Sequence, residues 1–460
     1  MGLYGDPFAW SGKEMEKREH LGSRLGFILL SAGCAIGVGN VWKFPWMTGQ
    51  NGGGIFVLIY LICLLVLGLP VMIAEFAMGR AAQLSPVEMY RPLEPAGSKW
   101  HIHGWFMLLG NICLMAFYTV IAGQLLNYFC RFLVGATNGI SYAAVSASPA
   151  QNVIYMLIIV AGCFGILSFN LQGGLERVTK ILMILLLVLM VVLAVRSMTL
   201  PGAAAGLAFY LAPDFSKLTG QTVVAAMNQA FFTLSLGIGA MAIFGSYIGR
   251  DRALAGESVR VILLDTFVAI TAGLIIFPAC STYGLDVGAG PSLLFDTMSA
   301  VFANMAGGRI WGTLFFLFMV FAAASTVLAV FETILACVRD LTGWSRPKGC
   351  FVCGIGIFLL SLTTALSGTV IHFQPFAPGS GFLDFWDFIV DYNLLPLGSL
   401  VIILFVCGKR YGWGWDAFTE EANAGKGMKV ADWMRPVFRF VVPIAILFIY
   451  IYGLATFGWK

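Results

Sequence analysis

The sequence predicts an all-α polytopic membrane protein with eleven transmembrane helices, two of them broken at mid-membrane. Of its 460 residues, 59% are hydrophobic and only 11% are charged, whereas soluble domains are about 25% charged. Two of the apolar stretches, at 22–47 and 221–248, carry glycines and polar residues near their centres. The ten cysteines lie mostly in apolar segments, which predicts buried thiols rather than a disulfide or zinc framework. This composition excludes a soluble globular domain.

Eleven apolar stretches are each long enough to cross a hydrocarbon layer of about 30 Å. Residues 291–306, between the seventh and eighth stretches, predict a short helical hairpin outside the membrane. Residues 411–432 predict an amphipathic, interfacial loop on the cytoplasmic side. The eleven predicted spans are 22–47, 54–79, 102–133, 152–170, 176–200, 221–248, 258–284, 308–338, 349–367, 386–408 and 436–456.

The positions of lysine and arginine predict the orientation of the chain. With the N-terminus inside, most of the 27 basic residues fall on the cytoplasmic side, for example at 13–24, 250–260 and 409–439. Cytoplasmic loops of membrane proteins are enriched in these residues. Residues 1–20 are polar and show no cleavable signal peptide. We therefore predict a multi-pass protein of the cytoplasmic (inner) membrane, with the N-terminus in the cytoplasm and the C-terminus outside.

Residues 31–42, SAGCAIGVGNVW, predict a break in the first span. Gly33, Gly37 and Gly39 are followed by a polar Asn40 at bilayer depth, and each glycine costs about 1 kcal/mol relative to alanine inside a helix. Broken backbone is tolerated in a membrane only where it is buried in protein or lines a cavity. The alternative is that small residues let two helices pack closely, which explains a single segment of this kind better.

The sixth span carries a second break of the same kind, in MNQAFFTLSLGIGAM at 227–241. Polar side chains there meet the pair Gly237 and Gly239 midway through the span. The two breaks stand five helices apart, so a repeat of five helices would enter from the opposite side and form an inverted repeat. Paired broken helices in two halves point to a transporter site, where helix N-termini meet a carboxylate and freed carbonyls bind Na⁺. Two matched breaks favour a binding site over close packing.

The chain resembles the neurotransmitter:sodium symporter family, especially its bacterial eleven-helix amino-acid transporters. The motifs that carry the resemblance are KREH (17–20), RLGFILLSAGCAIGVGNVWKFPW (24–46), NGGGIF (51–56), PVMIAEFAMGR (70–80) and NQAFFTLSLGIGAM (228–241). It implies alternating access driven by Na⁺. The expected organisation is an N-terminal cytoplasmic segment (1–21), two inverted five-helix repeats (22–200 and 201–409), a cytoplasmic loop (410–435), and helix 11 with a short extracellular end (436–460).

The resemblance implies two Na⁺ sites and no organic cofactor. Hard, mostly neutral oxygen ligands suit this ion. Taken alone, a Ser-Thr pair on an apolar helix more often bonds to its own backbone. The residues implied are Ala35, Asn40, Thr233 and Asp265 for the first site, and Gly33, Ile36, Ala322, Ser325 and Thr326 for the second.

Asp265 departs from the family pattern, because many members carry asparagine there. The alignment leaves Leu264 as the alternative, but leucine cannot bind sodium. An ionisable residue within the membrane is costly and functional by default. Chloride-dependent members carry a serine at the position of Ala269, so we expect Asp265 to supply the charge that chloride supplies elsewhere. The prediction is chloride-independent transport; a purely structural carboxylate is the alternative, and a role in carrying protons stays open.

The implied substrate is a neutral, hydrophobic or aromatic amino acid. Its carboxylate would meet the N–H groups of Val38 and Gly39 and the Tyr118 hydroxyl, while main-chain carbonyls would meet its amine. The implied pocket walls are mainly apolar and carry no charge. The substrate-binding residues implied are Cys34, Ala35, Val38, Gly39, Leu114, Tyr118, Phe232, Thr233, Ser235, Ile238, Thr326 and Val330.

Two charge pairs are implied as gates. Lys43 and Asp387 would close the outside through a water-mediated salt bridge, although most relatives carry arginine at position 43. Lysine lacks the bidentate fork of arginine, which suggests a looser gate. Arg18 and Asp340, with Tyr247 nearby, would close the cytoplasmic side.

Two further acidic residues lie within predicted spans. Glu75 is expected to accept hydrogen bonds from the broken backbone of helices 1 and 6. Glu332, near Thr326 on the same helix, is a candidate proton-binding site.

The predicted function is a Na⁺-coupled amino-acid symporter with membrane lipid as its surroundings and no nucleic-acid partner. A passive channel and a non-transporting amino-acid sensor on the same fold are the alternatives. An enzyme is disfavoured, because the predicted spans hold no nucleophile–histidine set and the glycine motifs lack the lysine and threonine of a phosphate-binding loop. Which amino acid is carried, the Na⁺ stoichiometry and the oligomeric state stay open.

Overall fold

The computed structural model describes residues 19–137, 140–287 and 293–457, and the regular structure of these residues is almost entirely helical. Nine continuous helices in this part of the chain are long and apolar enough to cross a membrane. Labels with η mark π-helical or 3₁₀ turns. The nine are α3–η2–α4 (Gly54–Ala82), α5 (His101–Val134), α7 (Pro149–Leu167), η3–α8 (Leu171–Met198), α12 (Leu254–Tyr283), α14 (Gly308–Thr342), α15 (Arg346–Ala365), α16–η6–α17 (Phe382–Cys407) and η7–η8–α19 (Asp432–Thr456).

The first predicted span is broken where the glycines predicted it. Helix α1 (Arg24–Ala35) ends before Ile36, whose backbone is extended. The chain resumes as η1 (Gly39–Lys43) and α2 (Phe44–Gln50), and the two parts are bent by 52°. Residues 36–38 therefore form the break.

The sixth span is broken in the same way. Helix α10 (Gly220–Thr233) and helix α11 (Ala240–Gly245) are separated by residues 234–239. Ser235, Gly237 and Gly239 have φ angles of 51°, 92° and 74°, in the left-handed region that glycine enters readily and serine rarely. If the bent first span and this broken pair each count as one span beside the nine continuous helices, the fold is consistent with the eleven predicted spans. The inverted repeat stays a prediction.

Several helices begin earlier than their apolar stretches. The helices that start at Leu171, Arg346, Phe382 and Asp432 include first turns with charged or polar residues, which a hydrophobic pattern does not count. The predicted hairpin at 291–306 is one helical segment where the structure describes it; its first two residues fall outside that part. The predicted loop at 411–432 contains a helix. The short helices are α6 (Tyr142–Ser146), α9 (Ala203–Leu211), η4 (Phe215–Lys217), η5 (Leu293–Thr297), α13 (Met298–Asn304) and α18 (Trp415–Ala422).

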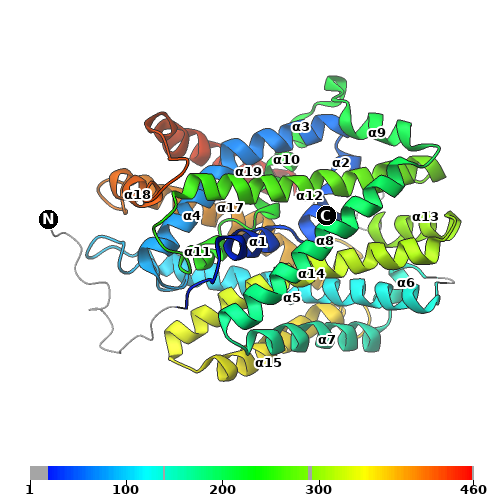
Figure 1. The fold of residues 1–460 in the computed structure, drawn as a ribbon, viewed down its shortest axis with the longest axis horizontal. Coiled ribbons are helices and arrows are strands. Elements are labelled where there is room, and N and C mark those ends of the chain that lie inside the picture. Colours follow the sequence, from blue (N-terminus) through cyan, green and yellow to red (C-terminus); the bar gives the residue numbers. More distant parts are fainter. Residues whose placement is uncertain (1–18, 138–139, 288–292, 458–460) are drawn as a thin grey trace.

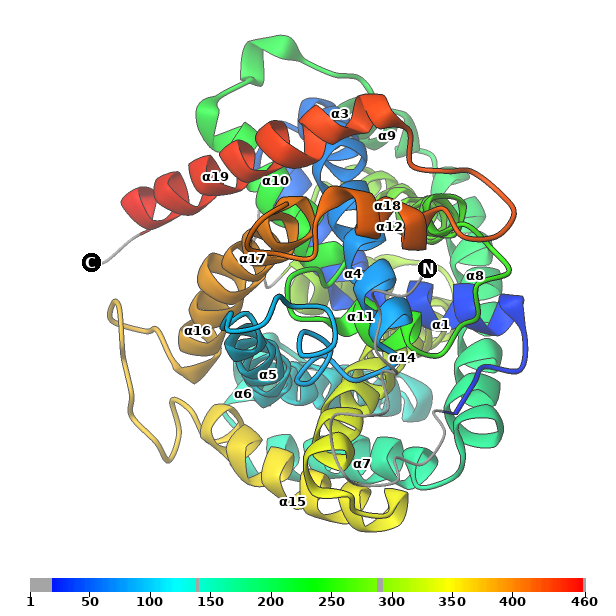
Figure 2. The ribbon, with the colours of Figure 1, turned by 90° about the vertical axis from the view of Figure 1, so that its left-hand side faces the viewer.

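The broken helices lie in the interior of the bundle. Helix α1 packs against α14, α12 and α8, and α11 packs against α4 (Leu69–Ala82) and α14. Figure 1 shows α18 at one end of the molecule and α6, α9 and α13 at the other. Figure 2 shows α7 and α15 on one side and α19 (Val442–Thr456) on the opposite side, with α4 and α11 in the middle. All ten cysteines are free thiols, and eight of them are buried.

The contact between α4 and α11 depends on a glycine without a side chain. A Cβ atom at Gly79 would lie 2.6 Å from the carbonyl carbon of Ala242 and 2.9 Å from its Cα. Because these neighbours are backbone atoms, a side chain at position 79 would fit only if one of the two helices moved.

We expect Gly79→Ala to destabilise the protein by about 2 kcal/mol, the usual scale of overpacking. Thermal unfolding of the purified protein in detergent measures this as a lower melting temperature. Gly162→Ala on α7 is the matched control, because a Cβ there would have no neighbour within 4 Å. Equal melting temperatures for the two variants would contradict the prediction.

Candidate functional site

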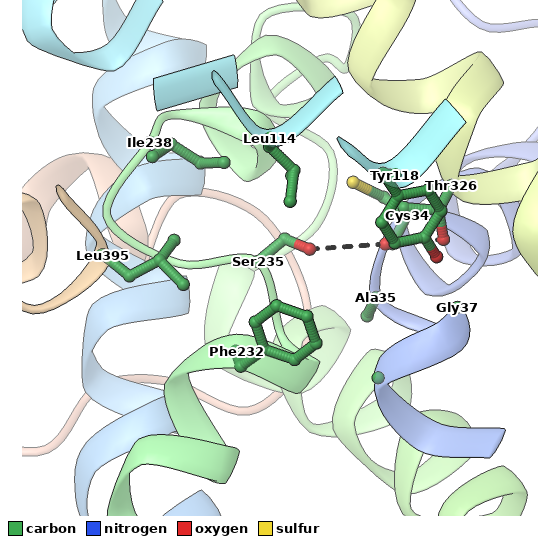
Figure 3. Close-up of a pocket in the computed structure, with 11 residues that line it drawn as sticks. Cys34, Ala35, Gly37, Leu114, Tyr118, Phe232, Ser235, Ile238, Thr326 and Leu395 are labelled. Atoms are coloured by element: carbon green, nitrogen blue, oxygen red, sulfur yellow. Dashed lines mark hydrogen bonds between the residues drawn. The ribbon is translucent and has the colours of Figure 1, made fainter. Parts of the chain in front are cut away.

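A small cavity lies between the two helix breaks, with a volume of about 20 Å³, close to the space that one water molecule needs. Its walls come from α1 and its break, α5, α10 and its break, α14 and the start of α17 (Leu395–Cys407). Figure 3 shows these side chains pointing toward one another from both sides. The lining residues are Cys34, Ala35, Gly37, Gly39, Leu114, Tyr118, Phe232, Ser235, Ile238, Thr326 and Leu395.

Most of the predicted substrate residues line this cavity, and three do not. Val330 is buried on α14 about one turn beyond Thr326 and packs in the core. Val38 and Thr233 lie beside the cavity. The Val38 N–H donates to the Tyr118 hydroxyl, and the Thr233 hydroxyl contacts the Asp265 carboxylate. Leu395 was not predicted, because it belongs to the tenth span and only the tertiary fold brings it to the pocket.

The first break presents a backbone N–H to the cavity region. The N–H of Val38 donates to the Tyr118 hydroxyl at 2.7 Å, and Tyr118 lines the cavity. The Ser235 hydroxyl of the second break lies 3.5 Å from the Cys34 carbonyl oxygen in the last turn of α1 (Figure 3). The backbone of the first break and a tyrosine hydroxyl therefore meet at one end of the pocket.

Oxygen atoms gather between the first break and α14. The Thr326 hydroxyl lies 3.2 Å from the Gly33 carbonyl oxygen and 3.3 Å from that of Ile36. The Ser325 hydroxyl lies 2.9 Å from the Ala322 carbonyl oxygen and 3.4 Å from that of Ile36. Two hydroxyl protons cannot satisfy this many acceptors, so the cluster is rich in unused lone pairs. It contains all five residues predicted for the second Na⁺ site.

A second polar cluster surrounds Asp265 of α12, whose side chain is fully buried. The Asn40 amide donates to the Asp265 carboxylate at 2.7 Å, and the hydroxyls of Thr233 and Tyr60 lie 3.4 Å and 3.5 Å from it. These three partners carry no charge. A buried carboxylate with only neutral partners is costly when ionised, which favours a nearby cation. Asp265, rather than Leu264, is therefore the α12 residue that meets Asn40.

Glu75 of α4 holds the second break in place. Its carboxylate accepts the N–H of Gly237 at 2.6 Å and that of Met241 at 3.1 Å. These are backbone donors that a helix terminus leaves without intrahelical partners. The predicted role is thus observed for the break of helix 6.

Three charged side chains meet at the predicted outer gate, where two were predicted. Lys43 Nζ lies 3.4 Å from Asp387 Oδ1, a direct contact rather than a water-mediated one, and it forms a closer ion pair with Asp391. Lys43 also stands over the Phe232 ring, 4.1 Å from its centroid. Asp391 was missed although it is a carboxylate within the predicted span 386–408, because its distance from Lys43 in the chain gives no sign that the two residues meet.

The structure describes two of the three residues predicted for the cytoplasmic gate. Arg18 lies outside the described residues. Asp340 accepts the N–H of Ser85 at 2.8 Å. Tyr247 donates its hydroxyl hydrogen to Glu332 at 2.7 Å.

Glu332 is not an isolated carboxylate. It forms a buried ion pair with Arg346 at 2.5 Å, so the candidate proton site has a permanent positive partner. The Glu19 carboxylate accepts the N–H of Leu171 at 2.7 Å and lies 3.5 Å from Arg346. The segment after residue 18 is therefore tied to helices far away in the chain.

Two broken helices around an uncharged cavity, flanked by two oxygen-rich clusters and by charge pairs on either side, define a multi-pass membrane transporter. The model of the sodium:neurotransmitter symporter family matches residues 18–138 and 144–459. The chain belongs to this family. It is a sodium-coupled transporter and not an enzyme.

Individual relatives agree with this assignment. An uncharacterized sodium-dependent transporter of Bacillus subtilis, YhdH, is 33% identical over 93% of this chain and 96% of its own. One from Haemophilus influenzae is 31% identical over 95% of this chain and 99% of its own. The crystal structure of MhsT in complex with L-phenylalanine superposes with a TM-score of 0.85 at 36% identity, covering 94% of this chain and 99% of MhsT.

Proposed function

We propose that this protein imports a neutral hydrophobic or aromatic amino acid together with Na⁺, independently of chloride. The observation that carries the proposal is one uncharged cavity placed between two helix breaks, with an oxygen cluster on one flank and the Asp265 cluster on the other.

The cavity supports an apolar substrate side chain. Leu114, Ile238, Leu395 and Phe232 face it from four different helices or breaks, and its lining includes no charged residue. The amino-acid carboxylate would take the N–H groups of the first break and the Tyr118 hydroxyl. At about 20 Å³ the walls must move apart to admit an amino acid. MhsT, with its bound L-phenylalanine, supports the same substrate class.

The two clusters support two Na⁺ sites of different character. At Ser325 and Thr326 the ion would be held by hydroxyls and main-chain carbonyls alone. At Asp265 it would meet a full negative charge, with the Asn40 amide turned to present its oxygen in place of its nitrogen. That fixed charge supplies what chloride would otherwise supply, which is why we propose chloride independence.

Uptake into proteoliposomes of the purified protein tests the proposal. With Na⁺ outside and K⁺ inside, we expect labelled phenylalanine or another hydrophobic amino acid to accumulate above its outside concentration. Replacing chloride with gluconate should leave uptake unchanged. Equilibration without accumulation would indicate a channel, Na⁺-dependent binding without flux would indicate a sensor, and loss of uptake in gluconate would refute chloride independence.

Thr326→Val is expected to weaken Na⁺ binding, because it removes the hydroxyl and keeps the shape of the side chain. A lost ligand to a buried cation costs about 1.5–3 kcal/mol, which corresponds to roughly 10- to 100-fold in the Na⁺ concentration for half-maximal uptake. Thr313→Val on the same helix is the matched control, since the Thr313 hydroxyl bonds only to the Arg309 carbonyl of its own helix. An unchanged Na⁺ dependence in Thr326→Val would remove Thr326 from the proposed site.

A further inference from the structure

The outer charge cluster contains one cation and two carboxylates that differ in burial. Asp387 and Asp391 lie one turn apart on the helix Phe382–Cys407, and both reach Lys43. The Asp391 side chain is 8% exposed and the Asp387 side chain is 31% exposed. The Lys43–Asp391 pair is also the closer of the two. An ion pair removed from water is held more strongly than an exposed one.

This cluster is mechanically connected to the cavity. Lys43 stands 4.1 Å from the centroid of the Phe232 ring, and Phe232 lines the cavity. Leu395, one turn beyond Asp391 on the same helix, lines it from another side. The Lys43–Asp391 pair therefore ties together the helices that carry two walls of the pocket.

We propose that Asp391 is the positioning residue of the outer gate: it holds Lys43 over Phe232 and so keeps the cavity closed to the outside. Asp387 has a secondary role as the more exposed carboxylate that receives Lys43 when the gate opens. The proposal rests on the proposed function, because it assigns a step of transport to this cluster.

The identity of residue 43 fits a gate with two carboxylates. A lysine ammonium is a compact charge on a flexible stem, whereas the arginine fork favours one fixed bidentate geometry. Two acceptors one turn apart give the ammonium two resting positions, a buried one and an exposed one. Lysine at position 43 and a second carboxylate at position 391 are thus complementary, and the gate need not be looser than an arginine gate.

The test compares Asp391→Asn with Asp387→Asn in the full-length protein in right-side-out vesicles. Each change removes one charge at nearly constant volume. The readout is the rate at which an impermeant thiol reagent modifies Cys34, followed on its own peptide by mass spectrometry, because Cys34 lines the cavity and is otherwise buried. We expect on the order of 30-fold faster modification in Asp391→Asn, the scale for breaking a buried charge pair, and less than about threefold in Asp387→Asn.

A second readout follows the proposed substrate. Release of labelled L-phenylalanine from the Na⁺-loaded protein should accelerate in Asp391→Asn and not in Asp387→Asn. An equal or larger effect of Asp387→Asn, or no effect of either change on Cys34, would overturn the gate assignment. If the wild type binds no L-phenylalanine, that substrate fails while the Cys34 rates still decide the gate. Asp391→Ser, which also removes the charge, gives the same comparison if Asp391→Asn does not fold.

Discussion

Asp265→Asn is expected to lower Na⁺-driven uptake by on the order of 100-fold. The change keeps the size of the side chain and leaves Asn40 and Thr233 close enough to form hydrogen bonds with it. It removes the negative charge from a fully buried site. A buried charge that loses its partner costs about 3 kcal/mol, and here the Na⁺ ion would lose its counter-charge. Initial uptake rates in proteoliposomes, measured over a range of Na⁺ concentrations, give the effect.

The stability of the same variant separates a functional charge from a structural one. Without Na⁺, an ionised Asp265 has only neutral partners and opposes folding, so the asparagine variant should melt at a higher temperature than the wild type. Added Na⁺ should stabilise the wild type by mass action and the variant much less. Asp214→Asn, in an exposed loop, is the control. A variant that melts lower in Na⁺-free buffer and still transports would show that Asp265 is structural.

The helix breaks could be predicted from the sequence because their cause is local. Glycines at 237 and 239 adopt left-handed backbone angles, and no other residue type enters that region as easily. Residues 36–38 leave the helix between glycines at 33 and 39. Glycines and polar residues inside an apolar span are visible without any knowledge of the neighbouring helices. The same holds for Asp265, which is conspicuous because a carboxylate in such a span is rare.

The parts that could not be predicted depend on contacts between distant segments. Leu395 reaches the cavity and Asp391 reaches Lys43 because the tenth span packs beside the breaks, and the residues near them in the chain do not indicate these contacts. Arg346 lies between the predicted spans 308–338 and 349–367, yet it is the first residue of α15 and pairs with Glu332 of α14. Some helix starts were missed because first turns with polar or charged residues look like loops to a hydrophobic pattern.

The two breaks differ in how they are held, and this difference bears on how they move. The second break is bonded through Glu75 to α4, and Gly79 and Ala242 bring those helices into backbone contact. The first break is joined to α14 by the hydroxyls of Ser325 and Thr326 and to α5 by Tyr118. An ion bound among those hydroxyls and carbonyls would strengthen the link between the first break and α14. Sodium binding and the position of α1 are therefore coupled in the proposed mechanism.

Gly37→Ala should weaken both amino-acid and Na⁺ binding in a protein that still folds. A Cβ atom at this position would overlap the Tyr118 hydroxyl and Thr326 Oγ1, and lie 3.2 Å from the Thr326 Cβ. Tyr118 is held by Val38 and Thr326 by several carbonyls, so neither can move away without giving up those contacts. Overpacking of this kind costs about 1–3 kcal/mol, and we expect roughly 10- to 100-fold weaker binding of both ligands.

Equilibrium binding of labelled amino acid at several Na⁺ concentrations measures the effect, and the melting temperature without Na⁺ or substrate checks the fold. Gly356→Ala on α15 serves as the control, because a Cβ there meets no atom within 4 Å. Without ligands, Gly37→Ala should melt at a lower temperature than Gly356→Ala, because the clash with Tyr118 and Thr326 is already present, but it should stay folded at the temperature of the binding assay. Wild-type affinity in Gly37→Ala would mean that substrate and Na⁺ bind away from the first break, and the proposed site would have to be abandoned.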